Sequence, residues 1–269
     1  MKKQFMDIEG KVILITGGTG FLGTEFCRHF LNLGARVIIF DITTKEFIDN
    51  TLPTIKKETG KEPWVSQVDI TKPEIIQNEL DEAIKHFDHI DVLINNAALN
   101  PVPGSRESAA QFSPYEKYPP DLWKKEVEVG LTGTQLMTQA VAREMMKQKS
   151  GSIINVSSIY GYVAPDNRIY DEGKFKSVAY ATVKSALLNF TRAWASYLGP
   201  YNVRVNSVVF GGVENNQNPA FIKKYSDKTM LGRMADKKDF NGALTLLASN
   251  DSSYITGSTF VLDGGFSAW

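Results

Sequence analysis

The sequence predicts an α/β fold in which a doubly wound, seven-stranded parallel sheet carries helices on both faces. Seven short runs rich in β-branched residues alternate with longer helical patterns from one end of the chain to the other. Most of the runs are continuously apolar, which is typical of strands covered on both faces. Strand–helix–strand repetition implies parallel pairing through right-handed crossovers. Because no linker or repeat divides the 269 residues, we expect a single domain.

The elements follow from these patterns in chain order. The strand candidates are Val12–Thr16, Val37–Phe40, Trp64–Val68, Asp91–Asn95, Ser152–Ser157, Val203–Phe210 and Thr259–Leu262. Apolar residues recur at helical spacing over residues 22–33, 75–87, 136–146 and 186–198. Two segments, 100–120 and 162–178, break this rhythm. Loops beyond the carboxyl ends of parallel strands line the ligand crevice, so both segments are candidate substrate loops.

Composition excludes several classes of protein. The 30 Lys and Arg residues balance 30 Asp and Glu residues, whereas nucleic-acid binders usually carry a basic excess. No stretch approaches the roughly 18 apolar residues of a membrane helix, and the N-terminus lacks the apolar run of a secretory signal. The single cysteine, Cys27, excludes an intrachain disulfide and is expected to be buried, and the three histidines form no metal-ligand pattern. We therefore expect a cytoplasmic protein with a small-molecule substrate and no metal.

A glycine-rich turn directly follows the first predicted strand and leads into a helix. It reads Thr16-Gly17-Gly18-Thr19-Gly20-Phe21-Leu22-Gly23. A pyrophosphate at a helix N-terminus needs close backbone N–H groups, which side chains would hold away. Asp41 directly follows the second predicted strand, about 20 residues after the turn, where Rossmann folds place the acid that binds the adenosine ribose. A carboxylate there favours NAD over NADP, although the nearby Lys45 leaves NADP as the alternative.

Further motifs make the chain similar to the short-chain dehydrogenase/reductase family over nearly its whole length. Asp69-Ile70-Thr71 resembles the family's adenine-side segment, and Asn95-Asn96-Ala97-Ala98 resembles its Asn-Asn-Ala-Gly motif. Residues 151–161 resemble the strand that carries the catalytic serine, which is Ser158 here, and Tyr180 and Lys184 match the Tyr-x-x-x-Lys motif. The resemblance implies a compact, single-domain NAD(P)-binding Rossmann fold.

A second Tyr-x-x-x-Lys pair, Tyr170 and Lys174, competes with the first. Its neighbours are typical of a loop, whereas Tyr180 and Lys184 open a helix and lie one turn apart on one face. We therefore assign Tyr180. Its separation from Ser158 is longer than the family usually shows, so residues 162–178 are interpreted as an insertion over the substrate site.

The resemblance implies hydride transfer between a carbinol or ketone carbon and a nicotinamide. Tyr180 is the implied general acid/base, with its pKa lowered by Lys184 and the nicotinamide, and Ser158 positions the substrate oxygen. The full set of implied cofactor-binding residues is Gly17, Thr19, Gly20, Phe21, Leu22, Gly23, Asp41, Asp69, Ile70, Asn96, Ala97, Ala98, Tyr180, Lys184, Gly211 and Val213.

The chain departs from the family pattern at two places. Gly130 stands where the family commonly has an asparagine, and we expect glycine not to support the backbone kink and bound water of the usual proton relay; Glu128 is a candidate substitute. After the sixth strand, Phe210-Gly211-Gly212 replaces the usual Pro-Gly. The glycine spacing resembles the family's sugar-nucleotide branch, but the chain after Lys184 is too short for that branch's substrate domain.

The substrate is the least determined feature. Residues 162–178 carry Asp166, Asn167, Arg168, Asp171, Glu172, Lys174 and Lys176, and Asn215 and Asn216 follow Gly212. Such groups suit hydroxyls and phosphate, although a solvated loop explains them equally well. A weak resemblance to enzymes of bacterial flagellin and surface-glycan modification also indicates a sugar. The favoured hypothesis is an NAD-dependent sugar or polyol oxidoreductase; the alternatives are a sugar-nucleotide epimerase or dehydratase that retains NAD, and a non-catalytic dinucleotide sensor.

The family resemblance also implies a homodimer or homotetramer. The apolar stretch 186–198, with Phe190 and Trp194, and the C-terminal Phe266–Trp269 are candidates for interfaces, although both suit the core as well.

Overall fold

A computed structural model describes residues 5–99 and 106–269. Its sheet has seven parallel strands in the order β3-β2-β1-β4-β5-β6-β7, which confirms the predicted fold class. The strands are β1 (Val12–Thr16), β2 (Arg36–Asp41), β3 (Trp64–Gln67), β4 (Val92–Asn95), β5 (Gly151–Ser158), β6 (Val203–Phe210) and β7 (Thr259–Leu262). They differ from the predicted strands by at most one residue at either end.

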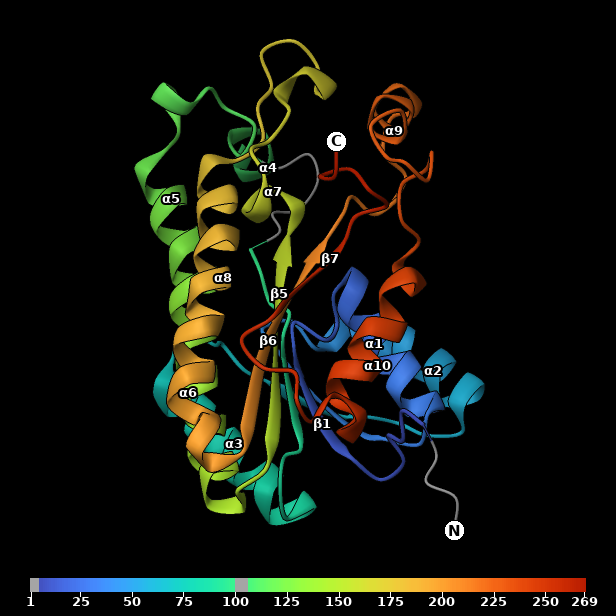
Figure 1. The fold of residues 1–269 in the computed structure, drawn as a ribbon, viewed down its shortest axis with the longest axis vertical. Coiled ribbons are helices and arrows are strands. Elements are labelled where there is room, and N and C mark those ends of the chain that lie inside the picture. The colour runs from blue at the N-terminus through green and yellow to red at the C-terminus, as the bar shows by residue number, and fades with distance from the viewer. Residues whose placement is uncertain (1–4, 100–105) are drawn as a thin grey trace.

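Helices cover both faces of the sheet (Figure 1). One layer holds α1 (Phe21–Asn32), α2 (Leu52–Thr59) and α10 (Asn241–Ala248), and the other holds α3 (Pro73–Phe87), α5 (Pro120–Val127), α6 (Thr134–Gln148) and α8 (Val178–Leu198). Three short helices, α4 (Arg106–Ala110), α7 (Ile159–Tyr162) and α9 (Pro219–Ser226), lie near the end of the sheet at which β5 ends. No helix within the described residues is long and apolar enough to cross a membrane.

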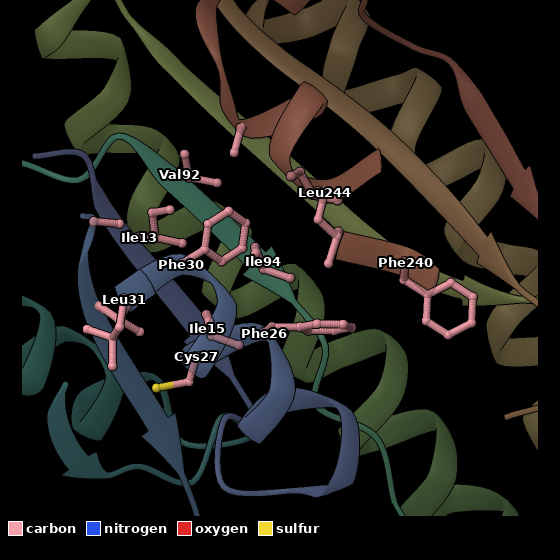
Figure 2. Packing of buried hydrophobic residues seen from close by; sticks show 14 of the residues in the cluster. Ile13, Ile15, Phe26, Cys27, Phe30, Leu31, Val92, Ile94, Phe240 and Leu244 are labelled. Atoms are coloured by element: carbon pink, nitrogen blue, oxygen red, sulfur yellow. The ribbon is translucent and has the colours of Figure 1, made fainter. Parts of the chain in front are cut away.

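The core on the α1 face fixes the helix that follows the glycine-rich turn. Phe26 and Phe30 are fully buried against strand residues such as Ile15 (Figure 2). The ring of Phe240, which directly precedes α10, stacks on that of Phe210 with 3.9 Å between centroids. Burying one such side chain contributes about 1.5–3 kcal/mol. Cys27 is also fully buried, as predicted, and burial raises the pKa of its thiol to about 12.

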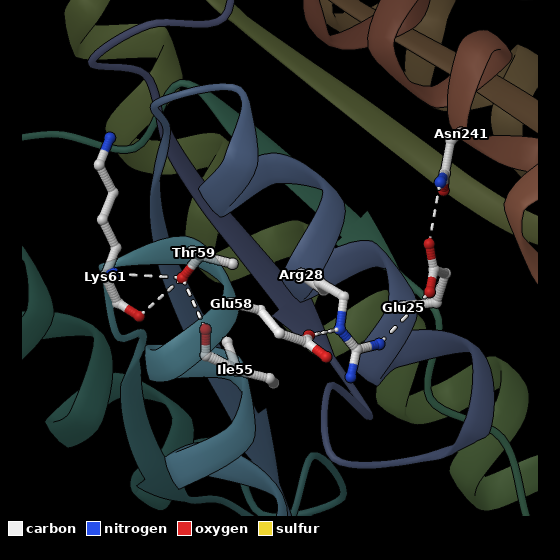
Figure 3. A network of polar contacts seen from close by, with 7 residues as sticks. All are labelled: Glu25, Arg28, Ile55, Glu58, Thr59, Lys61 and Asn241. Atoms are coloured by element: carbon white, nitrogen blue, oxygen red, sulfur yellow. Dashed lines mark hydrogen bonds and ion pairs between the residues drawn. The ribbon is translucent and has the colours of Figure 1, made fainter.

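A polar network on the same side ties α1 to both of its helical neighbours (Figure 3). Arg28 Nε donates to Glu58 Oε2 of α2 at 2.6 Å, and Asn241 Nδ2 of α10 donates to Glu25 Oε1 at 3.0 Å. Arg28 Nη1 also lies 3.4 Å from Glu25 Oε2. Glu25 is only 3% exposed, and a buried carboxylate needs partners such as Arg28 and Asn241. Contacts with α2 on one side and α10 on the other therefore fix the position of α1 and of its N-terminus.

The order of the strands places a crevice at the carboxyl edge of the sheet. The chain runs outward from β1 through β2 to β3, and outward on the other side from β4 to β7, so connections after β1 and β4 diverge. Open α/β sheets bind ligands at this switch point. The predicted substrate segment 162–178 forms a loop from residue 163 to 177 above that edge, between α7 and α8. The other predicted segment, 100–120, lies partly outside the described residues; its remainder includes α4.

Candidate functional site

The glycine-rich turn has the geometry of a phosphate cradle. Gly17 has a φ of +65°, and a Cβ there would lie 2.8 Å from the Cα of Ala97. A Cβ on Gly23 would lie 2.6 Å from the Cα of Gly18, so only glycine lets α1 start this close to the turn. Gly20, the N-cap of α1, has no side-chain cap, and a Cβ there would meet only Gly17 O, at 3.4 Å. The first-turn N–H groups, including those of Phe21 and Leu22, thus fit a pyrophosphate.

The segment after β4 closes one side of this cradle. Asn96 Nδ2 donates to the carbonyl oxygens of Thr16 and Gly17, both at 3.0 Å, and the N–H groups of Asn96 and Ala97 donate to Thr16 Oγ1. The side chain of Asn96 therefore clamps β4 to the turn. Asn96 and Ala98 also line the cleft that holds the reactive side chains.

Asp41 and Asp69 are the two acids that the sequence analysis assigns to the adenosine end of the cofactor. Asp41 Oδ2 accepts from Thr19 N at 3.0 Å, which binds the end of β2 to the glycine-rich turn. Asp69 Oδ1 accepts from the backbone N–H and the hydroxyl of Thr71, and Ile70 is buried against Gly133. Both carboxylates are partly exposed, so oxygen atoms remain available to a ligand. These residues fit the adenosine half of a dinucleotide.

Ser158, Tyr180 and Lys184 line one cleft. Ser158 is the last residue of β5, and Tyr180 and Lys184 lie on the first turns of α8. Gly161 makes this approach feasible, because a Cβ there would lie 2.7 Å from the N of Ser185 and nearer still to the Lys184 carbonyl. Ser157 Oγ donates to that carbonyl at 2.6 Å and fixes the helix to the strand.

Burial controls the ionisation of the two central groups. It raises the pKa of Tyr180, and the Ser158 hydroxyl, within hydrogen-bonding reach of the phenol, opposes the rise. The expected lowering of this pKa by Lys184 is not found in the protein alone, since Lys184 Nζ lies 5.8 Å from the ring centroid. Burial also lowers the pKa of Lys184 to about 8. Its Nζ donates to Val156 O at 2.7 Å, which leaves two further protons on the ammonium to donate.

Sequence reasoning missed a buried acid behind Tyr180. Glu126 of α5 is 4% exposed and accepts hydrogen bonds from Gln111 Nε2 at 3.0 Å, Tyr118 Oη at 2.5 Å and Ser177 Oγ at 3.0 Å. Ser177 is the N-cap of α8, and its Oγ accepts from Tyr180 N at 3.0 Å. The carboxylate thus fixes the start of the helix that carries Tyr180. In the sequence, Glu126 is indistinguishable from the exposed charges around it.

The departure at Gly130 leaves the backbone kink in place. A π-helical turn spans Glu128–Gly133 between α5 and α6, so the expectation that glycine would not support a kink is wrong. A Cβ at Gly130 would lie 2.6 Å from Cγ1 of Val183, a neighbour of Lys184, which explains why the position carries no side chain. Glu128 is exposed and takes no part in the cleft lining.

The structure separates the competing pair in the 163–177 loop. Lys174 is exposed and pairs with Asp171 at 3.0 Å, whereas Tyr170 lines the cleft and donates to Tyr160 Oη at 3.2 Å. Of the charged and amide residues of this loop, Lys176 alone is among the described residues that line the cleft. Asn215 and Asn216 line a different pocket.

The opposite wall of the cleft comes from the chain after β6. It includes Gly211 and Val213, the two implied cofactor residues on this side, together with Tyr225 of α9. Gly212 N donates to Tyr225 Oη at 2.5 Å, and Val213 forms an isolated parallel bridge with Ala235, which lies between α9 and α10. Sequence reasoning did not find Tyr225, because α9 lies far from β5 in the chain.

Comparison with known proteins fits this geometry. A family model described as "Enoyl-(Acyl carrier protein) reductase" matches residues 21–267. The chain is 32% identical to the 3-oxoacyl-[acyl-carrier-protein] reductase FabG of Thermotoga maritima over 265 residues, which cover 97% of this chain and 99% of that protein. The chain belongs to the short-chain dehydrogenase/reductase family.

Two further proteins are similar to this chain. A probable galactose dehydrogenase, GalD of Rhizobium meliloti, is 29% identical over 268 residues, 97% of each chain. The crystal structure of a short-chain dehydrogenase from Leptospira borgpetersenii with bound NAD+ is 32% identical, covers 99% of this chain and 96% of its own, and superposes with a TM-score of 0.82. This short-chain dehydrogenase/reductase is therefore an oxidoreductase whose fold binds a nicotinamide dinucleotide.

Proposed function

We propose that the protein is an NAD-dependent oxidoreductase that interconverts a secondary alcohol and a ketone on a sugar, sugar phosphate or polyol. The observation that carries the proposal is the convergence of Ser158, Tyr180 and Lys184 on one cleft beside the glycine-rich turn. The cleft is lined by hydroxyl and ammonium groups rather than by aliphatic chains alone, which supports a substrate rich in oxygen.

Each of the three side chains has a distinct task. A bound nicotinamide dinucleotide supplies the hydride donor or acceptor. The Tyr180 phenol, kept protonated by burial, gives its proton to the ketone oxygen during reduction and takes it back during oxidation. Ser158 donates a hydrogen bond to the same oxygen. Lys184, held by Val156 O, has two further N–H groups for the hydroxyls of the nicotinamide ribose.

Asp41 supports NAD over NADP. Its carboxylate is held at the turn by Thr19 N, where it accepts from a ribose 2′-hydroxyl and repels a 2′-phosphate. The relation to GalD supports a sugar substrate, and that to FabG favours an acyl chain instead. The hydroxyl and ammonium groups that this cleft contributes support the sugar.

The proposal is tested by following absorbance at 340 nm while NAD+ or NADP+ is offered with a panel of sugars, sugar phosphates and polyols. We expect NADH formation with at least one compound and a preference for NAD+. An epimerase or dehydratase would be identified if the purified protein retains NAD tightly and converts a sugar nucleotide without net formation of NADH. Binding of NADH with no conversion of any compound would favour a non-catalytic sensor.

We also propose that the protein is cytoplasmic and forms a homodimer or homotetramer. Trp194 donates its indole N–H to Gln135 of α6 at 3.0 Å and so belongs partly to the core, whereas Trp269 is 76% exposed at the C-terminus. Light scattering coupled to size exclusion measures the assembly.

A further inference from the structure

A second lysine lies beside the catalytic tyrosine. Lys176 Nζ is 4.1 Å from the centroid of the Tyr180 ring, closer than Lys184 Nζ. All three side chains line the same cavity of about 290 Å³, together with Ser158. An ammonium group so placed can contact a substrate that Ser158 and Tyr180 hold in this cavity. The two lysines have different roles. Lys184 Nζ is held by Val156 O, whereas Lys176 Nζ is not bound to that carbonyl.

The backbone holds Lys176 from both sides. Its own N–H donates to Asn167 Oδ1 at 2.9 Å, and the N–H of the preceding Phe175 donates to Phe112 O at 3.0 Å. The following residue, Ser177, is the buried N-cap of α8. A side chain that extends from a backbone fixed in this way reaches the cavity without ordering a loop first, which lowers the entropic cost of binding a ligand.

Glu126 and two aspartates of the 163–177 loop have partners other than Lys176. Glu126 accepts from Gln111, Tyr118 and Ser177, Asp166 pairs with Arg168 and Lys228, and Asp171 pairs with Lys174. Among the side chains that the structure describes, no carboxylate forms an ion pair with Lys176 Nζ. Burial lowers the pKa of Lys176 to about 8, and Glu126 opposes this from a distance. The cation therefore persists at neutral pH without a counter-ion in contact, an arrangement that an anion from solution would stabilise.

The remaining polar side chains that line the cavity are hydroxyls and the uncharged amides of Asn96 and Gln217. Burial raises the pKa of Tyr160, Tyr170 and Tyr225, so these phenols stay protonated at neutral pH. Tyr225 Oη accepts from Gly212 N, which leaves its own proton free to donate. The described lining residues include no aspartate or glutamate. The cavity thus offers two ammonium groups and several O–H donors, and it lacks a negative group to balance them.

We infer that Lys176 selects the substrate by binding an anionic group, a carboxylate or a phosphate, that the substrate carries near its carbinol carbon. This inference rests on the proposed alcohol–ketone oxidoreductase function and specifies its substrate class as anionic. The 163–177 loop is then a specificity element, and Lys176 is its single charged contact with the substrate.

Matched pairs of ketones test the inference in the full-length enzyme. The rate of NADH oxidation is measured at pH 7 with dihydroxyacetone phosphate against dihydroxyacetone, and with acetoacetate against methyl acetoacetate. The first pair reports on phosphate and the second on carboxylate. We expect the wild-type enzyme to prefer the charged member of at least one pair. In K176M, the kcat/KM for the charged ketone divided by that for the neutral ketone should fall by about tenfold or more. The exposed Lys174 gives the control K174M, which should leave the ratio unchanged. An unchanged ratio in K176M would overturn the inference.

A binding measurement separates this inference from the proposed reaction. Inorganic phosphate is titrated calorimetrically into wild type, K174M and K176M, each saturated with NADH so that the dinucleotide site is filled. Phosphate binding that is lost in K176M alone supports the anion site even if the enzyme reduces no ketone, in which case the proposed reaction is wrong. Turnover of ketones with no dependence on charge, and phosphate binding equal in all three proteins, would contradict the anion site and leave the reaction standing.

Discussion

The two sides of the cleft are built differently. The proposed dinucleotide side consists of a turn, a helix N-terminus and strand ends, in which glycines fix the shape and no side chain caps the first N–H groups of α1. The substrate side consists of side chains from distant segments, namely Ser158, Tyr170, Lys176, Tyr180 and Tyr225. A backbone site leaves a local pattern in the sequence, whereas a side-chain site depends on how distant elements pack. The first kind of site therefore identifies the family from the sequence, and we propose that the second determines the substrate.

Substitution of Gly23 should have the largest effect and should act on the dinucleotide side. In G23A the new Cβ overlaps the carbonyl of Gly17, so α1 has to move away from the turn. We expect loss of NADH binding by at least about a hundredfold or failure to fold, since backbone clashes of this kind cost several kcal/mol. Calorimetric titration with NADH measures it. Gly199, with nothing within 4 Å of a Cβ, provides the neutral control G199A; normal NADH affinity in G23A would contradict the cradle.

Substitution of Glu126 should act on the substrate side alone. E126A leaves Tyr118, Gln111 and Ser177 without their acceptor, and loosens the N-cap that positions Tyr180. We expect a stability loss of about 1–3 kcal/mol in urea unfolding and a roughly tenfold lower kcat with unchanged NADH affinity. The exposed Glu128 gives the control E128A. Equal losses of NADH affinity and kcat would show that the two sides are not separable.

Substitution of Asp41 should change which dinucleotide binds. D41N removes the negative charge but keeps an acceptor for Thr19 N. We expect NADH to bind about tenfold more weakly and NADPH to gain relative to it, because the repulsion of a 2′-phosphate is removed. Both affinities are measured by quenching of protein fluorescence. If wild type already prefers NADPH, Asp41 does not have this role and Lys45 becomes the candidate.

The smallest expected effect is on stability as a function of pH. Lys176 holds its proton with a pKa of about 8 when folded, against 10.5 when free. Between these values the unfolded chain binds more protons than the folded one, so this lysine makes stability rise with pH in that window. The advantage of K176M over wild type should therefore be largest below pH 8, on the order of 1 kcal/mol, and shrink towards pH 10.5. Urea unfolding at pH 7 and pH 10 measures this advantage. A stability difference between K176M and wild type that is the same at both pH values would contradict the burial of the Lys176 ammonium group.

The same contrast explains how far the sequence could predict the molecule. Continuous β-branched runs located the seven strands, and glycine spacing located the turn, because both are local signals. The short polar helices α2, α5 and α9 were missed, since their few buried positions do not stand out. Glu126 and Tyr225 were missed for a related reason: their role arises only where α5 meets α8 and where α9 meets the end of β6. Of the charged residues in the 163–177 loop, only packing distinguishes Lys176 from its solvated neighbours.

The most direct test of the central claim compares binding and turnover in Y180F. The phenolic hydroxyl is the only group removed, and Tyr180 lines the cleft together with Ser158. We predict that Y180F binds NADH as wild type does and loses about 10²–10⁴ in kcat on whichever substrate the panel identifies. Y162F, at an exposed tyrosine, should retain both properties. Full turnover in Y180F, or loss of NADH binding with turnover reduced in proportion, would contradict the assignment of Tyr180 as the acid/base.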